Sequence, residues 1–555
     1  MTGTRRINCT IEMRIALAAA VFAVLAPSLF VSTPPLGDFA NHAARLWLLA
    51  GGANMPPLDT IYEVRWSQAT TNVAVDAVAV ALGRLIPISM VSSALVALSF
   101  LLPPLGAALL NIAIFRRTHW WQVLIFLFAW GFTSVHGLMN FHIGLGLALL
   151  ATALDVRLDG LGTWARLALR IACAGLLFSV HAFALAFYLA LIGALVLGRD
   201  LAALTSVRGL WSRSLAAAVA VLPLLALPVA MMLASSALPG AHLAAGATGA
   251  QAPPDQFGIY WDNPGVIDRL GIMLIPIRTY SHFVDLFFLL CLAVPFFLAM
   301  ATRRLALHGG LFLVALILVA ASQVMPSAVN GTWWLDKRLP NMAALMMVAS
   351  LQPLVASFGR RGRMAVAAAL LILSARAAWI AHAWNAVGAD TLAVERVLTH
   401  VPPGAALLSM QNRPDRHQAI WHGPFGRFTY GEPAYRHLPT LAIVQRRAFV
   451  PTLFTAAGKQ PVTVRRPWSE IAVPEGDLPS PSVLREPRTI AYNFPYLAYW
   501  RTRFDYLLLL NADMADGKGQ LPDDPALTLV ADEGFARLYR IVRSEPPAVR
   551  RLTAD

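Results

Sequence analysis

Long apolar stretches separated by short polar segments follow one another through the first two thirds of the chain. An α-helix of about 20 apolar residues crosses a hydrocarbon core of roughly 30 Å, and many of these stretches approach that length. The pattern predicts a polytopic α-helical membrane protein with about eleven crossings. The predicted spans are 15–30, 89–115, 120–137, 138–156, 167–181, 183–198, 212–234, 283–302, 304–325, 340–357 and 364–384.

One further apolar segment, 72–87, has two interpretations. It forms a half-helix that ends at Pro87, or it crosses the membrane and pairs with 89–115. The second arrangement would move Arg116 and Arg117 to the outer side, against the usual placement of basic residues. We therefore favour the half-helix.

The pattern changes at about residue 385. Prolines and charged residues become frequent, and short β-like stretches alternate with polar loops. We expect a transmembrane domain over 1–384, with an external loop at 34–70 that carries an interfacial helix. A C-terminal α/β domain outside the membrane should follow over 385–555.

Composition supports this interpretation and excludes an ordinary soluble protein. Hydrophobic residues make up 57% of the chain and charged residues only 13%, whereas soluble proteins carry about 25% charged residues. The net charge of +14 comes from short arginine clusters between apolar stretches, which is typical of loops on the inner side of a membrane and not of nucleic-acid binding. The sequence thus predicts a multi-pass membrane protein with its N-terminus inside and its C-terminal domain outside.

The first candidate site begins directly after the first predicted span. Asp38 follows a turn with two prolines and a glycine, and starts a helical pattern. At about 100° per residue, Asp38, His42 and Arg45 share one face of that helix. Asp38 is either a helix cap alone or a catalytic or binding group, and Arg45 is a candidate for binding substrate or phosphate.

A second cluster interrupts an apolar run at 133–146, where His136, Asn140 and His142 occur. Irregular backbone at membrane depth survives where protein or a cavity covers it, so these residues are candidates for substrate binding, as is His181. The alternative is helix packing through neighbouring glycines with incidental histidines. The spacing of the histidines matches no compact metal motif, and we assign no metal ligand.

A third cluster, Lys337 and Arg338, follows two tryptophans and precedes a predicted span on the outer side. Ammonium and guanidinium groups at this place suit a phosphate at the lipid interface. The alternative is that they are interfacial cations that extend toward water.

This arrangement resembles the GT-C class of membrane glycosyltransferases, which includes protein O-mannosyltransferases and bacterial aminoarabinose transferases. The resemblance rests on the layout and on the local segment Gly37-Asp38-Phe39-Ala40-Asn41-His42. It implies a protein of the bacterial inner membrane, a sugar donor carried on polyprenyl phosphate and a glycan, lipid or protein acceptor outside the cytoplasm. By position, Asp38 would be the general base and His42 would orient it or the acceptor.

One departure concerns metal. Many GT-C enzymes carry a further acidic residue in the second external loop, but 133–146 has no Asp or Glu. A divalent metal is therefore left open as a cofactor, without assigned ligands.

Two other functions stay open. A non-catalytic scaffold for polysaccharide assembly would need Asp38 only as a helix cap. A lipid or glycan transporter would be expected to have corresponding broken helices in two halves, and the sequence shows no such pair.

Overall fold

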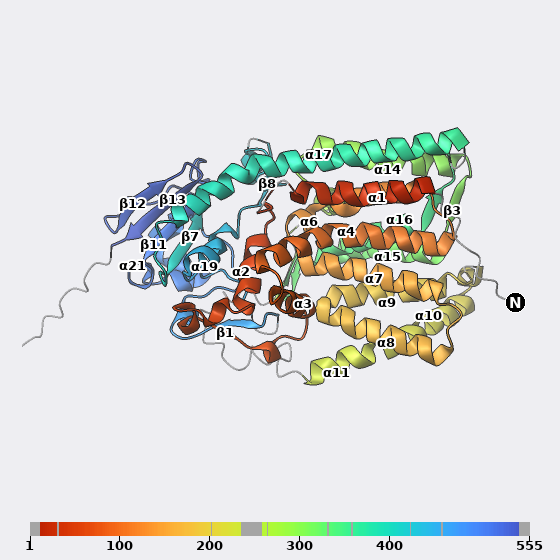
Figure 1. Ribbon diagram of the computed structural model, residues 1–555, viewed down its shortest axis with the longest axis horizontal. Coiled ribbons are helices and arrows are strands. Elements are labelled where there is room, and N and C mark those ends of the chain that lie inside the picture. Colours follow the sequence, from red (N-terminus) through yellow and green to blue (C-terminus); the bar gives the residue numbers. More distant parts are fainter. Residues whose placement is uncertain are drawn as a thin grey trace, which may run out of the picture.

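The computed structural model describes residues 11–542, apart from residues 30, 32, 201, 235–257, 263–264, 330–331, 357–358, 422, 457–458 and 475. A bundle of helices forms one end of the molecule, and a smaller region of strands and short helices forms the other (Figure 1).

Among the residues that the structure describes, seven helical segments are long and apolar enough to cross a membrane. Each coincides with a predicted span, so the polytopic helical fold is confirmed. The segments are α1 (Ile11–Leu25, extended by a 3-10 turn, Ala26–Leu29), α4 (Ile88–Phe115), α7 (Met139–Arg157), α8 (Thr163–Val180), α10 with α11 (Val207–Val221 and Ala226–Ala234), α14 (His282–Ala301) and α17 (Gly359–Leu398).

Two of the remaining predicted spans are helices of 16 residues, α9 (Ala182–Leu197) and α15 (Gly309–Val324). At 1.5 Å per residue each is about 24 Å long. Both lie within the bundle, between longer helices (Figure 1).

The prediction of a single helix over 120–137 is wrong. The structure breaks it into α5 (Trp121–Ile125), a 3-10 turn (Phe126–Ala129) and α6 (Phe132–Val135). At Gly131 the backbone is extended, and a Cβ there would lie 2.4 Å from the carbonyl oxygen of Pro276. The segment is almost wholly buried, so surrounding protein covers the interrupted backbone.

The span expected at 340–357 starts earlier. Helix α16 covers Leu335–Ala349, and the strand β6 (Leu351–Pro353) then pairs with β3 (Leu305–Leu307). Lys337 and Arg338 consequently lie in the first turn of α16 instead of before it. As favoured above, the apolar segment before Pro87 contains only a short helix, α3 (Ala74–Gly83).

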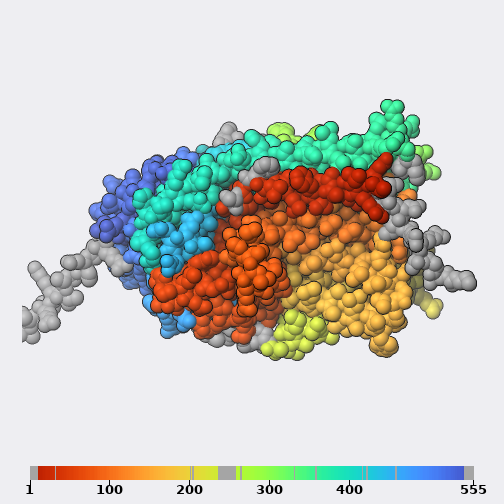
Figure 2. Space-filling model, in the orientation of Figure 1, coloured from red at the N-terminus to blue at the C-terminus, as the bar shows by residue number. Residues whose placement is uncertain are grey.

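The C-terminal region contains a four-stranded sheet in the order β12-β13-β11-β7. Strands β7 (Leu407–Gln411) and β11 (Tyr506–Leu510) are parallel, whereas β13 (Ala536–Ile541) is antiparallel to both β11 and β12 (Leu527–Asp532). Helix α17 passes without a break through the boundary expected at 384 and ends at Leu398. Figure 2 shows it along the surface of both parts of the molecule.

Helix α2 (Phe39–Leu49) joins the two parts. Phe39 and Leu46 belong to the core of the bundle, while Ala44 and Leu48 belong to the core of the C-terminal region. We expected this helix to lie along the membrane surface, but nine of its 11 residues are buried. It is apolar on two sides because it packs against two cores, and Asp38 at its start therefore lies at their junction.

Candidate active site at the junction of the two parts

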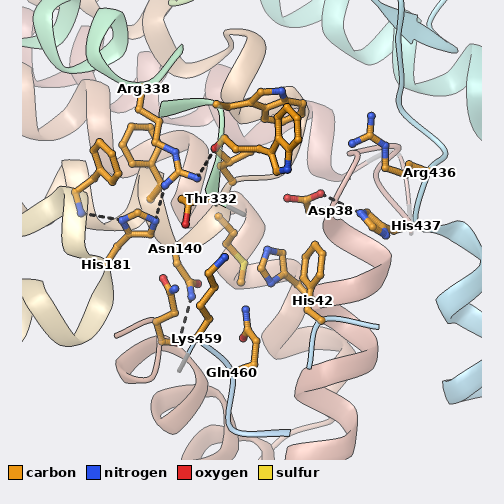
Figure 3. Close-up of a pocket in the computed structure, with 18 of the residues that line it drawn as sticks. Asp38, His42, Asn140, His181, Thr332, Arg338, Arg436, His437, Lys459 and Gln460 are labelled. Atoms are coloured by element: carbon orange, nitrogen blue, oxygen red, sulfur yellow. Dashed lines mark hydrogen bonds and ion pairs between the residues drawn. The ribbon is translucent and has the colours of Figure 1, made fainter. Parts of the chain in front are cut away.

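A cavity of about 590 Å³ lies where the bundle meets the C-terminal region. Helix α2 and the ends of the bundle helices form one part of its wall, and loops of the C-terminal region form the other (Figure 3). From the first part come Asp38, His42, Asn72, Asn140, Phe141, His181, Phe183, Trp333, Trp334 and Arg338; from the second come Arg413, Glu432, Arg436, His437, Phe454, Lys459, Gln460 and Asp477.

Asp38 is held against the second candidate loop by a close backbone contact. Its N–H donates to the carbonyl oxygen of His136 at 2.9 Å. A Cβ on Gly37 would lie 3.0 Å from that same oxygen, and a Cβ on Gly137 would lie 3.0 Å from the Asp38 nitrogen. Gly137 also has a positive φ of 82°, which glycine adopts without strain. The two glycines thus let two loops that are far apart in the sequence meet at Asp38.

The carboxylate of Asp38 faces the cavity. Asp38 occupies the N-cap position of α2, but its side chain makes no capping hydrogen bond. The side chain is 23% exposed, and Oδ1 lies 3.5 Å from Nε2 of His437. The interpretation of Asp38 as a helix cap alone is therefore not supported.

Arg338 and His181 meet on the opposite side of the cavity (Figure 3). Nδ1 of His181 lies 3.0 Å from the backbone nitrogen of Phe183, and its Nε2 lies 3.2 Å from Nη1 of Arg338. Every nitrogen of Arg338 is a donor, so its guanidinium suits an anion in the cavity.

Arg338 is fixed in place by its surroundings. Its Nη2 donates to the carbonyl oxygen of Trp333 at 3.3 Å. Its guanidinium also lies 4.9 Å from the ring centroid of Phe183 and 5.7 Å from that of Phe141. These contacts orient the guanidinium at the wall of the cavity.

The C-terminal region adds charged groups of both signs. Lys459 points toward the middle of the cavity, between Asp38 and Arg338 (Figure 3). Arg436 lies within 2.8 Å of Glu432 and 3.3 Å of Asp477. Burial alone would raise the pKa of Asp477, but Arg436 and other cations outweigh it and hold that pKa below its usual range. Asp477 is therefore ionised and neutralises Arg436.

His42 and Asn140 also line the cavity. Burial, followed by the charge of Arg45, lowers the pKa of His42 well below its usual value, so this imidazole is neutral. Its Nδ1 has no hydrogen-bond partner among the described residues. Asn140 donates to the carbonyl oxygen of Asn72 at 3.3 Å, which leaves its amide oxygen for another partner.

Four of the residues predicted from the sequence do not line the cavity. Arg45 is fully buried and pairs with Asp76 at 2.8 Å, so its expected contact with substrate is corrected. His142 bonds to Thr133 inside the bundle at 2.9 Å.

The other two lie just behind the wall. His136 touches Asp38 only through its backbone, and its ring packs against Phe132 at a centroid distance of 4.1 Å. Lys337 lies over the rings of Phe132 and Trp334, at 5.0 and 5.1 Å. Neither residue is among those that line the cavity.

Sequence reasoning missed the C-terminal half of the wall. Arg436, His437, Lys459 and Asp477 lie in loops without a recognisable motif. They reach the site because the strand β1 (Tyr62–Val64) pairs with β10 (Val462–Val464) and because α2 packs on this region. The one local signal was the adjacent basic pair at 436 and 437.

No group of three or more His, Cys, Asp or Glu side chains close enough to hold a metal ion occurs in the part of the chain that the structure describes. Four carboxylates line the cavity, from Asp38, Asp262, Glu432 and Asp477, and the last two pair with Arg436. We therefore assign no residue to a metal.

No protein-family model matches the chain, and no curated protein matches it. Among solved structures, it is similar to ArnT from Cupriavidus metallidurans bound to undecaprenyl phosphate and to the same protein in the apo state. Each comparison covers 95% of this chain and 97% of that chain, with 13% sequence identity and a TM-score of 0.49. Identity at this level identifies no shared site residue.

Proposed function

We propose that this protein is a membrane glycosyltransferase that moves a sugar from a polyprenyl-phosphate donor to an acceptor, with Asp38 as the general base. The observation that carries the proposal is the cavity itself. A carboxylate faces it from one side, the guanidinium of Arg338 lines it on the other, and it lies at the ends of membrane-length helices. The proposed location is the bacterial inner membrane, with the N-terminus inside and the cavity and C-terminal region outside.

The reaction moves one proton and exchanges one bond. Asp38 takes the proton from a hydroxyl of the acceptor, and the freed oxygen bonds to the anomeric carbon of the sugar. The bond between that carbon and the phosphate oxygen breaks, and polyprenyl phosphate leaves with the electron pair. A positioned base of this kind contributes about 10²–10⁴-fold to the rate.

Negative charge builds up on the phosphate oxygens as the bond breaks, so cationic donors near them lower the barrier. Arg338 supplies one such donor, and Lys459 supplies a second charge from the C-terminal side. Phe141 and Phe183 form an apolar wall beside Arg338, where the first isoprenyl units would lie. The cavity volume of about 590 Å³ suits a sugar and a phosphate, since small-molecule sites measure roughly 300–1,000 Å³.

The acceptor is a glycan, a lipid or a protein that carries a hydroxyl group. Polar groups from Gln460, Asn140 and Arg413 line the cavity and suit hydrogen bonds to such an acceptor.

The test is a transfer assay on the purified full-length protein with a panel of polyprenyl-phosphate sugars. Released polyprenyl phosphate is measured for the wild type, for Asp38→Asn and for the matched control Asp59→Asn. Asp59 is an exposed carboxylate of the same loop. We expect Asp38→Asn to lose at least about 100-fold in kcat in a protein that remains folded, and the control to behave as the wild type.

A second pair of variants separates the donor site from the base. Arg338→Gln should raise the KM for the donor and lower kcat, whereas Arg488→Gln, at an exposed arginine remote from the cavity, should change neither. Full activity of Asp38→Asn would remove the proposed base. Absence of turnover in the wild type across the donor panel would count for the scaffold or transporter alternatives.

A further inference from the structure

The buried contact between α2 and the C-terminal region contains a set of hydrogen bonds around Asn41 that leads to His437, beside Asp38. Asn41, one turn after Asp38, accepts from the backbone N–H of Phe454 through Oδ1 at 2.8 Å. Its Nδ2 donates to the carbonyl oxygen of Thr452 at 2.8 Å. An oxygen partner on one side and a nitrogen partner on the other fix the orientation of this amide.

The same Nδ2 lies 3.1 Å from Nδ1 of His437. Because an amide nitrogen only donates, Nδ1 of His437 must accept, and the neutral ring carries its proton on Nε2. That Nε2 faces Oδ1 of Asp38 at 3.5 Å, as the dashed line in Figure 3 shows. Burial, and after it the charge of Arg436, lowers the pKa of His437 to about 3, so the ring is neutral at ordinary pH.

His437 is itself held from several sides. Only 4% of its side chain is exposed, and its ring packs edge-on against Phe454 at a centroid distance of 4.9 Å. Its carbonyl oxygen accepts from both the backbone and the hydroxyl of Thr440. A ring fixed in this way can orient a neighbouring carboxylate.

We propose that His437 is a positioning residue for Asp38, with its tautomer set by Asn41. The Nε2–H holds Oδ1, which directs the other carboxylate oxygen into the cavity toward the acceptor hydroxyl. The distance of 3.5 Å is longer than an ordinary hydrogen bond, and such contacts in ligand-free sites often tighten when substrate binds. This inference rests on the proposed function, because it gives Asp38 the role of base.

A consequence concerns the C-terminal region. The group that orients the base comes from this region, while the base comes from the loop after the first membrane helix. The site is therefore complete only when the C-terminal region is docked on α2.

The test uses two substitutions that divide the functions of the ring. His437→Gln can place its amide N–H near the position of Nε2, whereas the shorter amide of His437→Asn reaches the position of Nδ1 but not that of Nε2. We expect His437→Asn to lose at least tenfold in kcat with little change in the KM for the donor. His437→Gln should stay within a few-fold of the wild type, as should His400→Gln, an exposed control.

The pH profile gives a readout that a purely structural role would not move. Without the Nε2–H donor, the ionised form of the carboxylate is less stabilised, so the acid limb of kcat/KM in His437→Asn should move to higher pH. The other titratable or charged groups that face Asp38 and His437 are Arg436, Asp477 and His42. They are the same in both variants. Equal activity and equal pH profiles of the two His437 variants would overturn the proposal.

A thermal double-mutant cycle tests the contact without using activity. Asp38→Asn, His437→Asn and the double variant are melted in detergent, and non-additive shifts in Tm support the pair. Additive shifts would overturn it, even if the wild type shows no turnover and the proposed function itself fails.

Discussion

Replacement of Arg45 by methionine distinguishes a residue that binds substrate from one that holds the fold. Nη2 of Arg45 lies 2.8 Å from Oδ1 of Asp76, and neither side chain has any exposed surface. Nε and Nη1 of Arg45 and Oδ2 of Asp76 have no hydrogen-bond partner among the described residues. This one ion pair therefore carries most of the compensation for burying both charges.

Arg45→Met leaves the charge of Asp76 buried without its partner. Breaking a buried pair from one side costs about 3–5 kcal/mol, whereas replacing both partners by apolar side chains is often neutral or stabilising. We expect Arg45→Met to lower Tm clearly, and Arg45→Met combined with Asp76→Leu to recover most of the loss. Any Arg45→Met protein that stays folded should keep the wild-type KM for the donor, because Arg45 does not line the cavity.

The assay is thermal melting of the detergent-purified protein by size-exclusion chromatography, followed by donor titration at a temperature where every variant is folded. Arg84→Met is the matched control, since Arg84 is an exposed arginine at the end of the helix that carries Asp76. A wild-type Tm for Arg45→Met together with a raised KM would refute the reasoning and return Arg45 to the donor site.

Two further predictions concern the Asp38 loop and acid stability. Gly137→Ala places a Cβ 3.0 Å from the Asp38 nitrogen, at a φ of 82°. Left-handed backbone costs a non-glycine residue about 1–2 kcal/mol, so both Tm and turnover should fall. Gly160→Ala, which has open space around it, should change neither. The pKa of His437 falls from 6.5 to about 3 on folding. Between these two pH values the unfolded chain binds a proton on His437 that the folded chain does not bind. The free energy of unfolding therefore decreases as pH falls through this range, by up to about 1.4 kcal/mol per pH unit. The Tm of His437→Gln should accordingly fall less steeply than that of the wild type between about pH 7 and 5, and parallel curves would show that His437 is not buried in its neutral form.

The sequence predicted where the candidate site lies better than which residues form it. Asp38, His42, Asn140, His181 and Arg338 do line the cavity, since each interrupts an apolar stretch near the end of a helix. Interruptions of this kind can be seen in a single sequence, because polar groups at membrane depth require a partner or a cavity.

The sequence alone could not tell which of two neighbouring residues with the same charge lines the cavity. Lys337 and Arg338 are adjacent and both basic, but successive helical positions point about 100° apart. One of them lines the cavity and the other packs over Phe132 and Trp334. Arg45 shares the charge and the helix face expected for a phosphate ligand, yet α2 is buried on that face, and Asp76 takes its charge.

The sequence by itself determined that the chain is a polytopic helical membrane protein with a different, less apolar C-terminal region. Apolar length and charge placement are local properties, so no knowledge of contacts is needed to recognise a span. Only the tertiary structure decided the C-terminal half of the cavity and the partner of Asp38. Asn41 and His437 lie 396 residues apart and meet because α2 packs against two cores, and contacts of this kind depend on how surfaces from distant segments fit together.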